Sequence, residues 1–156
     1  MRFCIAIVLL SGCLSIEAEI EESCISRRDV EIEGVTGTTI SRAFLVDDLS
    51  DVHRLLEYDG DLELLRADIR ATTDLGFVES ASIAFEGTPV YACAGDCPAD
   101  GNALTLPAAT RESVLPYLSA DSIAIALTVT GQLPGTAWSA DIDVCVRGTV
   151  SYEVRP

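Results

Sequence analysis

The clearest pattern in the sequence is the alternation Ile123-Ala124-Ile125-Ala126-Leu127-Thr128-Val129, in which every second side chain is large and apolar. Successive side chains of a β-strand point to opposite faces, so a period of two is typical of a strand with one buried face. The stretch 138–146 repeats the pattern, because Ile142 and Val144 alternate with acidic residues, and 150–154 continues it beyond Gly148. We therefore predict half-buried β-strands in the last third of the chain.

The same period recurs upstream, in segments separated by Gly, Pro and Asp. The apolar positions that share a parity are Val30 and Ile32; Ile40, Phe44 and Val46, with Arg42 interrupting; Leu65, Ala67, Ile69 and Ala71; and Ala81, Ile83 and Phe85. Many short strands without helices between them indicate an antiparallel β-sandwich rather than a βαβ fold. The sequence thus predicts one all-β sandwich over residues 24–156, for which an immunoglobulin-like arrangement is one form.

One segment breaks the period of two. Leu49, Val52, Leu55 and Leu56 share one helical face, and Asp48 is a suitable N-cap. We expect a short helix over residues 48–57 and a second helical turn between Thr110 and Leu118, where Pro116 limits its length.

The first residues have the composition of an export signal. Arg2 precedes the apolar run Cys4-Ile5-Ala6-Ile7-Val8-Leu9-Leu10, and small residues follow. The run is too short to span a bilayer, which takes about 20 apolar residues. Residues 1–12 are therefore predicted to be a signal peptide.

The tetrad Leu10-Ser11-Gly12-Cys13 resembles the lipobox of bacterial lipoprotein precursors. The resemblance implies that Cys13 receives a diacylglycerol, becomes residue one after cleavage, and carries acyl chains such as palmitate that hold the protein on a membrane. Leu14 follows the cysteine, where Asp implies inner-membrane retention in enteric-type lipoproteins, so the outer membrane is the expected location. Ordinary secretion with cleavage after Ala18 is the alternative. The acidic residues 13–23 would form a solvated tether.

Four cysteines remain after processing, namely Cys24, Cys93, Cys97 and Cys145. An even number in an exported protein indicates two disulfides, and three connectivities are possible. We favour Cys93–Cys97, which closes a tight loop, together with Cys24–Cys145, although Cys145 falls on the polar parity of its strand and would place that bridge at an edge. A zinc site and a redox dithiol at Cys93 and Cys97 are the alternatives.

The composition argues against several function classes. The chain has 156 residues, with 25 acidic and 10 basic side chains and a formal net charge of −15. This balance argues against nucleic-acid binding. All the basic residues are Arg, so a Walker-type lysine and a Schiff-base lysine are absent, and a single His precludes a two-His metal site.

Candidate chemical groups are few. His53 is the sole imidazole and has no nucleophile motif near it, so we predict no catalytic residue and no cofactor. Calcium could bind the alternating carboxylates of Asp59, Asp61 and Glu63 or the loop of Asp96 and Asp100, but both stretches also suit turns. A pair of carboxylates could also cleave a glycoside, but no particular pair stands out among the 25 acidic residues.

Together these features predict a lipid-anchored envelope protein with a structural or protein-interaction role, and not an enzyme. The late segment from Cys93 to Cys145 is similar to small cysteine-containing β-sandwich lipoproteins of unknown function. A module that binds a small ligand, calcium or a saccharide is the alternative, followed by a carboxylate-based hydrolase.

Overall fold

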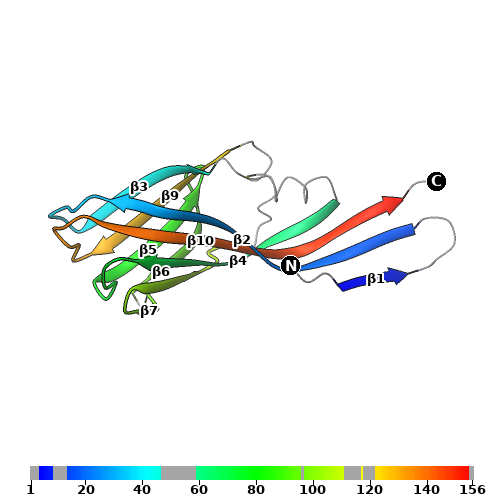
Figure 1. Ribbon diagram of the computed structural model, residues 1–156, viewed down its shortest axis with the longest axis horizontal. Coiled ribbons are helices and arrows are strands. Elements are labelled where there is room, and N and C mark those ends of the chain that lie inside the picture. The colour runs from blue at the N-terminus through cyan, green and yellow to red at the C-terminus, as the bar shows by residue number, and fades with distance from the viewer. Residues whose placement is uncertain are drawn as a thin grey trace.

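The described residues form ten β-strands arranged in two sheets, shown in Figure 1. The computed structural model describes residues 4–8, 14–46, 59–95, 97–110, 117 and 122–154. The strands are β1 (Cys4–Val8), β2 (Leu14–Ile32), β3 (Thr39–Val46), β4 (Asp59–Ala71), β5 (Val78–Phe85), β6 (Thr88–Ala94), β7 (Ala99–Asp100), β8 (Ala103–Pro107), β9 (Ile123–Gly131) and β10 (Trp138–Val154). The predicted helix at 48–57, with His53, lies outside the described residues, as does most of the stretch 110–118.

The sheet order identifies the sandwich as a jelly roll. The six-stranded sheet, which we call sheet A, has the order β1-β2-β10-β4-β8-β7, and the four-stranded sheet B has the order β3-β9-β5-β6. From β2 to β10 the chain crosses between the sheets at every connection except β5–β6 and β7–β8. The prediction of an all-β antiparallel sandwich is therefore confirmed. The immunoglobulin-like form is wrong. The order β2-β10-β4-β8 in one sheet and β3-β9-β5-β6 in the other is that of an eight-stranded jelly roll and differs from the strand order of an immunoglobulin domain.

The core lies between the two sheets and follows the predicted alternation. In β9 the odd-numbered residues from Ile123 to Gly131 are buried and the even-numbered ones are half-buried. Ile83 and Phe85 of β5 lie beside them in sheet B, and Ile142 and Val144 of β10 are buried in the opposite sheet. Burial of each such side chain stabilises the fold by about 1.5–3 kcal/mol.

One parity prediction fails at a β-bulge. Opposite β10, the register of β4 shifts between Cys145, which pairs with Arg66, and Val146, which pairs with Leu64. Leu65 is therefore an extra residue, and Leu64 is buried in its place. A bulge inserts one residue and reverses the facing of all residues before it, which an alternation rule cannot anticipate.

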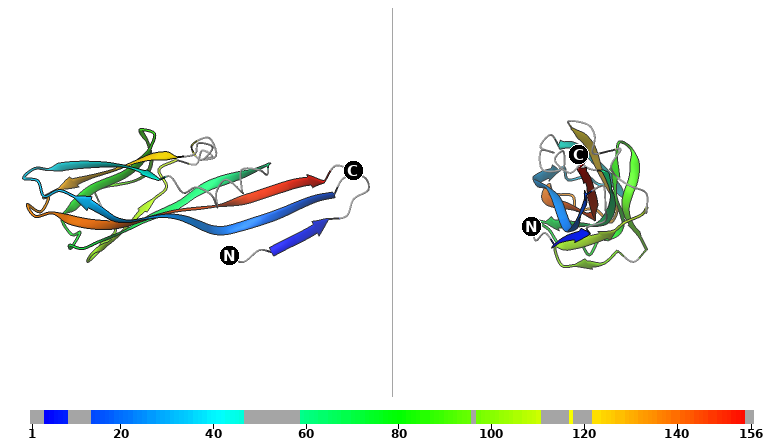
Figure 2. Two further views of the ribbon diagram at one scale, coloured as in Figure 1. Left: turned by 45° about the horizontal axis from the view of Figure 1, so that its top comes forward. Right: turned by 90° about the vertical axis from the view of Figure 1, so that its right-hand side faces the viewer.

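A ribbon of paired strands extends beyond the sandwich, as Figures 1 and 2 show. It is formed by the first half of β2 and the second half of β10, which pair from Ile20 with Gly148 to Leu14 with Val154. The start of β4 joins this ribbon, and β1 pairs with β2 from Cys4 with Glu19 to Val8 with Ser15. The stretch from Leu14 to Ser23, predicted to be a solvated tether, is therefore strand. Its partner is the end of β10, more than a hundred residues away.

No helix in the described part of the chain is both long and apolar enough to cross a membrane.

Candidate functional site

A disulfide joins the two long strands where the ribbon meets the sandwich. Cys24 of β2 and Cys145 of β10 are directly opposite in the register, with Cα atoms 4.0 Å apart. This confirms the favoured pairing. The predicted edge position is wrong, because β10 lies between β2 and β4 within sheet A. Cys145 is only 1% exposed, so the bridge is half covered although it lies on the polar parity.

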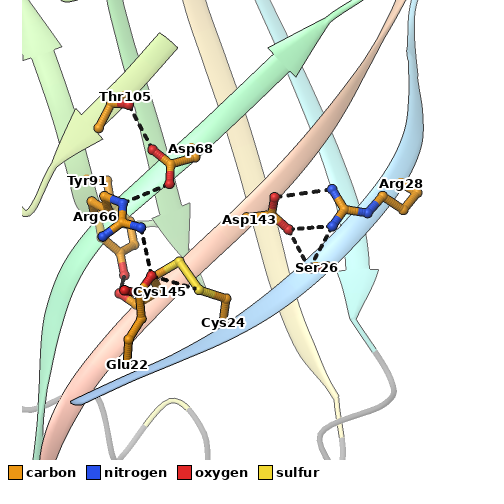
Figure 3. The surroundings of a disulfide bond; sticks show 10 residues. All are labelled: Glu22, Cys24, Ser26, Arg28, Arg66, Asp68, Tyr91, Thr105, Asp143 and Cys145. Carbon is orange, nitrogen blue, oxygen red and sulfur yellow. Dashed lines mark hydrogen bonds and ion pairs between the residues drawn. A yellow bond between two sulfur atoms is a disulfide. The ribbon is translucent and has the colours of Figure 1, made fainter. Parts of the chain in front are cut away.

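Charged side chains cover this disulfide on the outer face of sheet A, as Figure 3 shows. Arg66 donates to Glu22 at 2.7 Å and to Asp68 at 2.8 Å, and Thr105 donates to Asp68 at 2.8 Å. The hydrogen bond to Asp68 is the largest influence on Arg66 and raises its pKa. The network links β2, β4 and β8 and occupies the space above Cys145.

A second network lies further along the same face. Arg28 of β2 contacts Asp143 of β10 at 2.8 Å, and Ser26 also hydrogen-bonds to Asp143. Desolvation by itself would raise the pKa of Asp143. The hydrogen bonds from Ser26 and Arg28, together with the positive charges of Arg28 and Arg70, outweigh desolvation and lower this pKa. Asp141 and Asp143, the acidic residues that alternate with Ile142 and Val144, thus form an ion-paired surface with Arg28.

The short disulfide also forms as favoured. Cys93, near the end of β6, is bonded to Cys97, four residues later. Both sulfurs of each bridge are bonded to each other and offer no thiolate to a zinc ion. Among the described residues, one group of potential ligands gathers within 4.8 Å, namely Glu22, Cys24 and Cys145. Its sulfurs belong to the long disulfide and offer no thiolate to a metal ion.

The candidate calcium stretches are placed as follows. Asp59 and Asp61 lie in β4 and pair with β10, so the expected turn is instead extended strand. The carboxylate of Glu63 is 3.3 Å from Arg147, which already neutralises it. Asp96 lies outside the described residues. Asp100 begins a tight turn in which Gly101 has φ 60° and Asn102 donates to the Ala71 carbonyl at 3.0 Å, so the turn interpretation is confirmed there.

The two long sides of the sandwich differ in how they close. On one side, Tyr91 of β6 forms an antiparallel bridge with Ala108, and the Ala109 amide donates to the Val90 carbonyl at 2.8 Å. On the other side, the part of β2 that follows Glu19, which β1 does not cover, and β3 are the facing edges of the two sheets, and no backbone hydrogen bond joins these two described strands. We call this side the open seam.

A groove of about 220 Å³ lies in the open seam. It is lined by residues of β2 and β3, namely Arg27, Asp29, Val30, Glu31, Arg42, Ala43 and Phe44. Neither the Arg27 nor the Arg42 side chain has a hydrogen bond or ion pair with any described residue. Only Arg42 had been noticed in the sequence, as a break in the alternation. The open seam could not be predicted from the sequence, because it lies between strands that belong to different sheets.

The outer face of sheet B contrasts with that of sheet A. Apart from Leu45, which is 60% exposed, its side chains are small and uncharged over three neighbouring strands: Thr39, Ser41 and Ala43 of β3, Ala126, Thr128 and Thr130 of β9, and Ser80, Ser82 and Ala84 of β5. Ser41 hydrogen-bonds to Thr128 at 3.1 Å. Charge on the described sandwich is therefore concentrated on sheet A and at the seam.

No family model matches the chain, and no curated protein matches it significantly. Among solved structures, the chain is similar to the infectious bursal disease virus VP2 subviral particle, with 14% identity and a TM-score of 0.36 over 89% of this chain and 38% of that one. The structure of the Gx strain of the same virus matches with 15% identity and a TM-score of 0.35 over 96% and 40%. The chain thus spans about two fifths of these two chains. A structure described as "CBM4 structure and function" matches with 18% identity and a TM-score of 0.28 over 91% and 87%. At these TM-scores the jelly-roll assignment rests on the strand pairing of this chain itself.

Proposed function

We propose that this protein is a lipid-anchored component of a bacterial cell envelope that acts by binding another envelope protein. The observation that carries the interaction role is the open seam, where two strand edges and two arginines without described partners face one groove. Unpaired strand edges are the usual acceptors of an added strand from a partner.

The two disulfides support the envelope location. Disulfides persist in oxidising compartments such as the bacterial periplasm and on cell surfaces, and are rare in the cytosol. The chain has two, and they involve all four cysteines that follow Cys13.

The ribbon supports the anchored arrangement. A lipid on Cys13 would be attached one residue before β2 begins. The sandwich would then stand on the ribbon, whose seven residue pairs span roughly 20 Å. The sandwich lies at the end of the molecule remote from β1 and the C-terminal end of β10 (Figure 2). A paired ribbon would hold the seam at a defined distance from the membrane, which a flexible tether would not.

Mass spectrometry of the chain purified from membranes without reduction tests the anchor. We expect an N-terminal acylated Cys13 and a mass four hydrogens below that of the free thiols. A Cys13→Ser variant should leave the membrane fraction, and a Cys4→Ser variant should remain there. An unmodified N-terminus at Glu19 would replace anchoring with ordinary secretion.

A further inference from the structure

The free edge of β3 presents backbone groups that have no partner in the described structure. The amide of Gly131 donates to the carbonyl of Thr38, and residues 38 and 131 fall opposite one another in the register of β3 and β9. In an antiparallel pair, hydrogen-bonded and non-hydrogen-bonded residues alternate. The even-numbered residues of β3 therefore bond to β9, and the N–H and C=O groups of Ser41, Ala43 and Leu45 point away from the sheet.

Apolar side chains are less well covered at this seam than at the closed one. Ile40 and Phe44 of β3 and Ile25 of β2 are only partly buried against the core. At the closed side, Val90 and Tyr91 are 0% exposed. An additional strand beside β3 would cover Ile40 and Phe44 and supply the missing backbone partners.

Two arginines on the inward parity favour one kind of strand, while Asp29 and Glu31 also line the groove. Arg42 is opposite Leu127, and Arg27 is opposite Ile142, and both of these partners are buried core residues. The register therefore places both arginines on the inward parity of their edge strands, where they line the groove. An inward charge on an edge strand opposes indiscriminate strand addition. It favours a partner that places a carboxylate opposite it.

A second copy of this chain is a poor occupant. Antiparallel pairing of two β3 strands about their centre places the two Arg42 side chains opposite or diagonal to each other, and like charges there are destabilising. Antiparallel pairing of two β2 edges directs the two ribbons in opposite directions, so both copies could not stand on one membrane.

We infer that the open seam accepts an extended strand of another envelope protein, one that alternates apolar side chains with carboxylates and pairs with β3 so that the carboxylates meet Arg42 and Arg27. This inference rests on the interaction role proposed above and specifies its surface and ligand chemistry. The partner strand would add a fifth strand to sheet B and close the sandwich.

The test uses the full disulfide-bonded chain and two synthetic nine-residue peptides. Both alternate Thr and Val, and two positions on the Val face carry Glu in one peptide and Lys in the other. Fluorescence anisotropy should show the Glu peptide binding about tenfold more tightly than the Lys peptide, as expected for two exchanged cross-strand charge pairs. Amide exchange should slow at Ser41, Ala43 and Leu45. Equal affinities, no binding, or protection confined to other strands would overturn the inference.

Two substitutions sharpen the test. Arg42→Glu should reverse the preference between the peptides. Ala43→Pro removes an outward amide without removing a bond to β9 and should abolish binding, whereas Ala43→Val should bind as the parent chain does. Circular dichroism melts of each variant verify the fold. Retained binding by Ala43→Pro would contradict pairing along β3.

A photo-crosslinking residue separates failure of the seam from failure of the interaction role. It is placed at Phe44, which lines the groove, or, as a control on the outer face of sheet B, at Ser82 of β5, and the chain is irradiated in isolated envelopes. A discrete adduct from Phe44 that the Glu peptide suppresses supports the seam. An adduct from Ser82 alone keeps the interaction role and overturns the seam, and the absence of both overturns both.

Discussion

The hydroxyl of Tyr91 donates a hydrogen bond of 3.0 Å to the backbone carbonyl of Cys145, crossing the core from sheet B to sheet A. The carbonyl lies at the bulge where β4 loses register with β10. Burial raises the pKa of Tyr91, so the hydroxyl remains protonated and available as a donor. One side chain thus joins the closed side of the sandwich to the disulfide-bearing strand.

Replacing Tyr91 with Phe should destabilise the fold by about 1–3 kcal/mol, because the buried carbonyl of Cys145 would lose its hydroxyl partner. Urea unfolding followed by circular dichroism measures this. Tyr117→Phe is the control, since Tyr117 also packs edge-on against Phe85 but is only half-buried. Equal losses for the two variants would contradict the importance of the hydrogen bond.

The two disulfides should differ in their contribution to stability. Their sequence separations are 121 for Cys24–Cys145 and 4 for Cys93–Cys97. The chain-entropy relation gives about 5 kcal/mol for the long loop and about 2 kcal/mol for the short one. Double Cys→Ala variants of each pair, compared by urea midpoint, test this order. A larger loss from the short loop would contradict it.

Asp143→Asn should flatten the acid limb of the stability curve. The folded pKa of Asp143 is lowered, so its contribution is fully present above the unfolded value of about 3.9 and is lost as pH falls through the folded pKa. Because this carboxyl is partly exposed, the effect should be about 1 kcal/mol or less. Urea unfolding between pH 7 and pH 2 measures it, with Asp100→Asn as the control. A parallel loss of stability in the parent and Asp143→Asn chains would contradict the prediction.

Gly131→Ala should destabilise the junction of β9 with β5. Gly131 has φ 146°, and a Cβ there would lie 1.9 Å from the Phe77 carbonyl oxygen, so the backbone must move. We expect a loss of at least about 3 kcal/mol. In Gly87→Ala the new Cβ meets nothing within 4 Å, so only the φ of 84° opposes it and the loss should be about 1–2 kcal/mol. Thermal melts compare the two variants. Similar losses of stability would mean that backbone strain at positive φ, rather than the contact with Phe77, causes the destabilisation.

Much of the fold could be predicted from the sequence because strand periodicity is local. The alternation in β9 and β10 needs no knowledge of the neighbouring strands, since the pleat itself directs successive side chains to opposite faces. The ribbon was missed even though Ile16, Ala18 and Ile20 alternate with glutamates, because the many acids there equally suggest a solvated tether. The closed Cys93–Cys97 loop was predictable because its ends are forced close together.

Only the tertiary structure decided how the strands are ordered and which edges remain free. The bulge at Leu65 shifts the facing of β4, and the crossing connections place β2 and β3 at the same open side. Arg27 and Arg42 gather at one groove for this reason, although they belong to different sheets. The alternation period and the composition are properties of a single segment, and they determine whether that segment forms a strand. Sheet order and seam closure depend on backbone hydrogen bonds between strands distant in the chain, for which alternation carries no information.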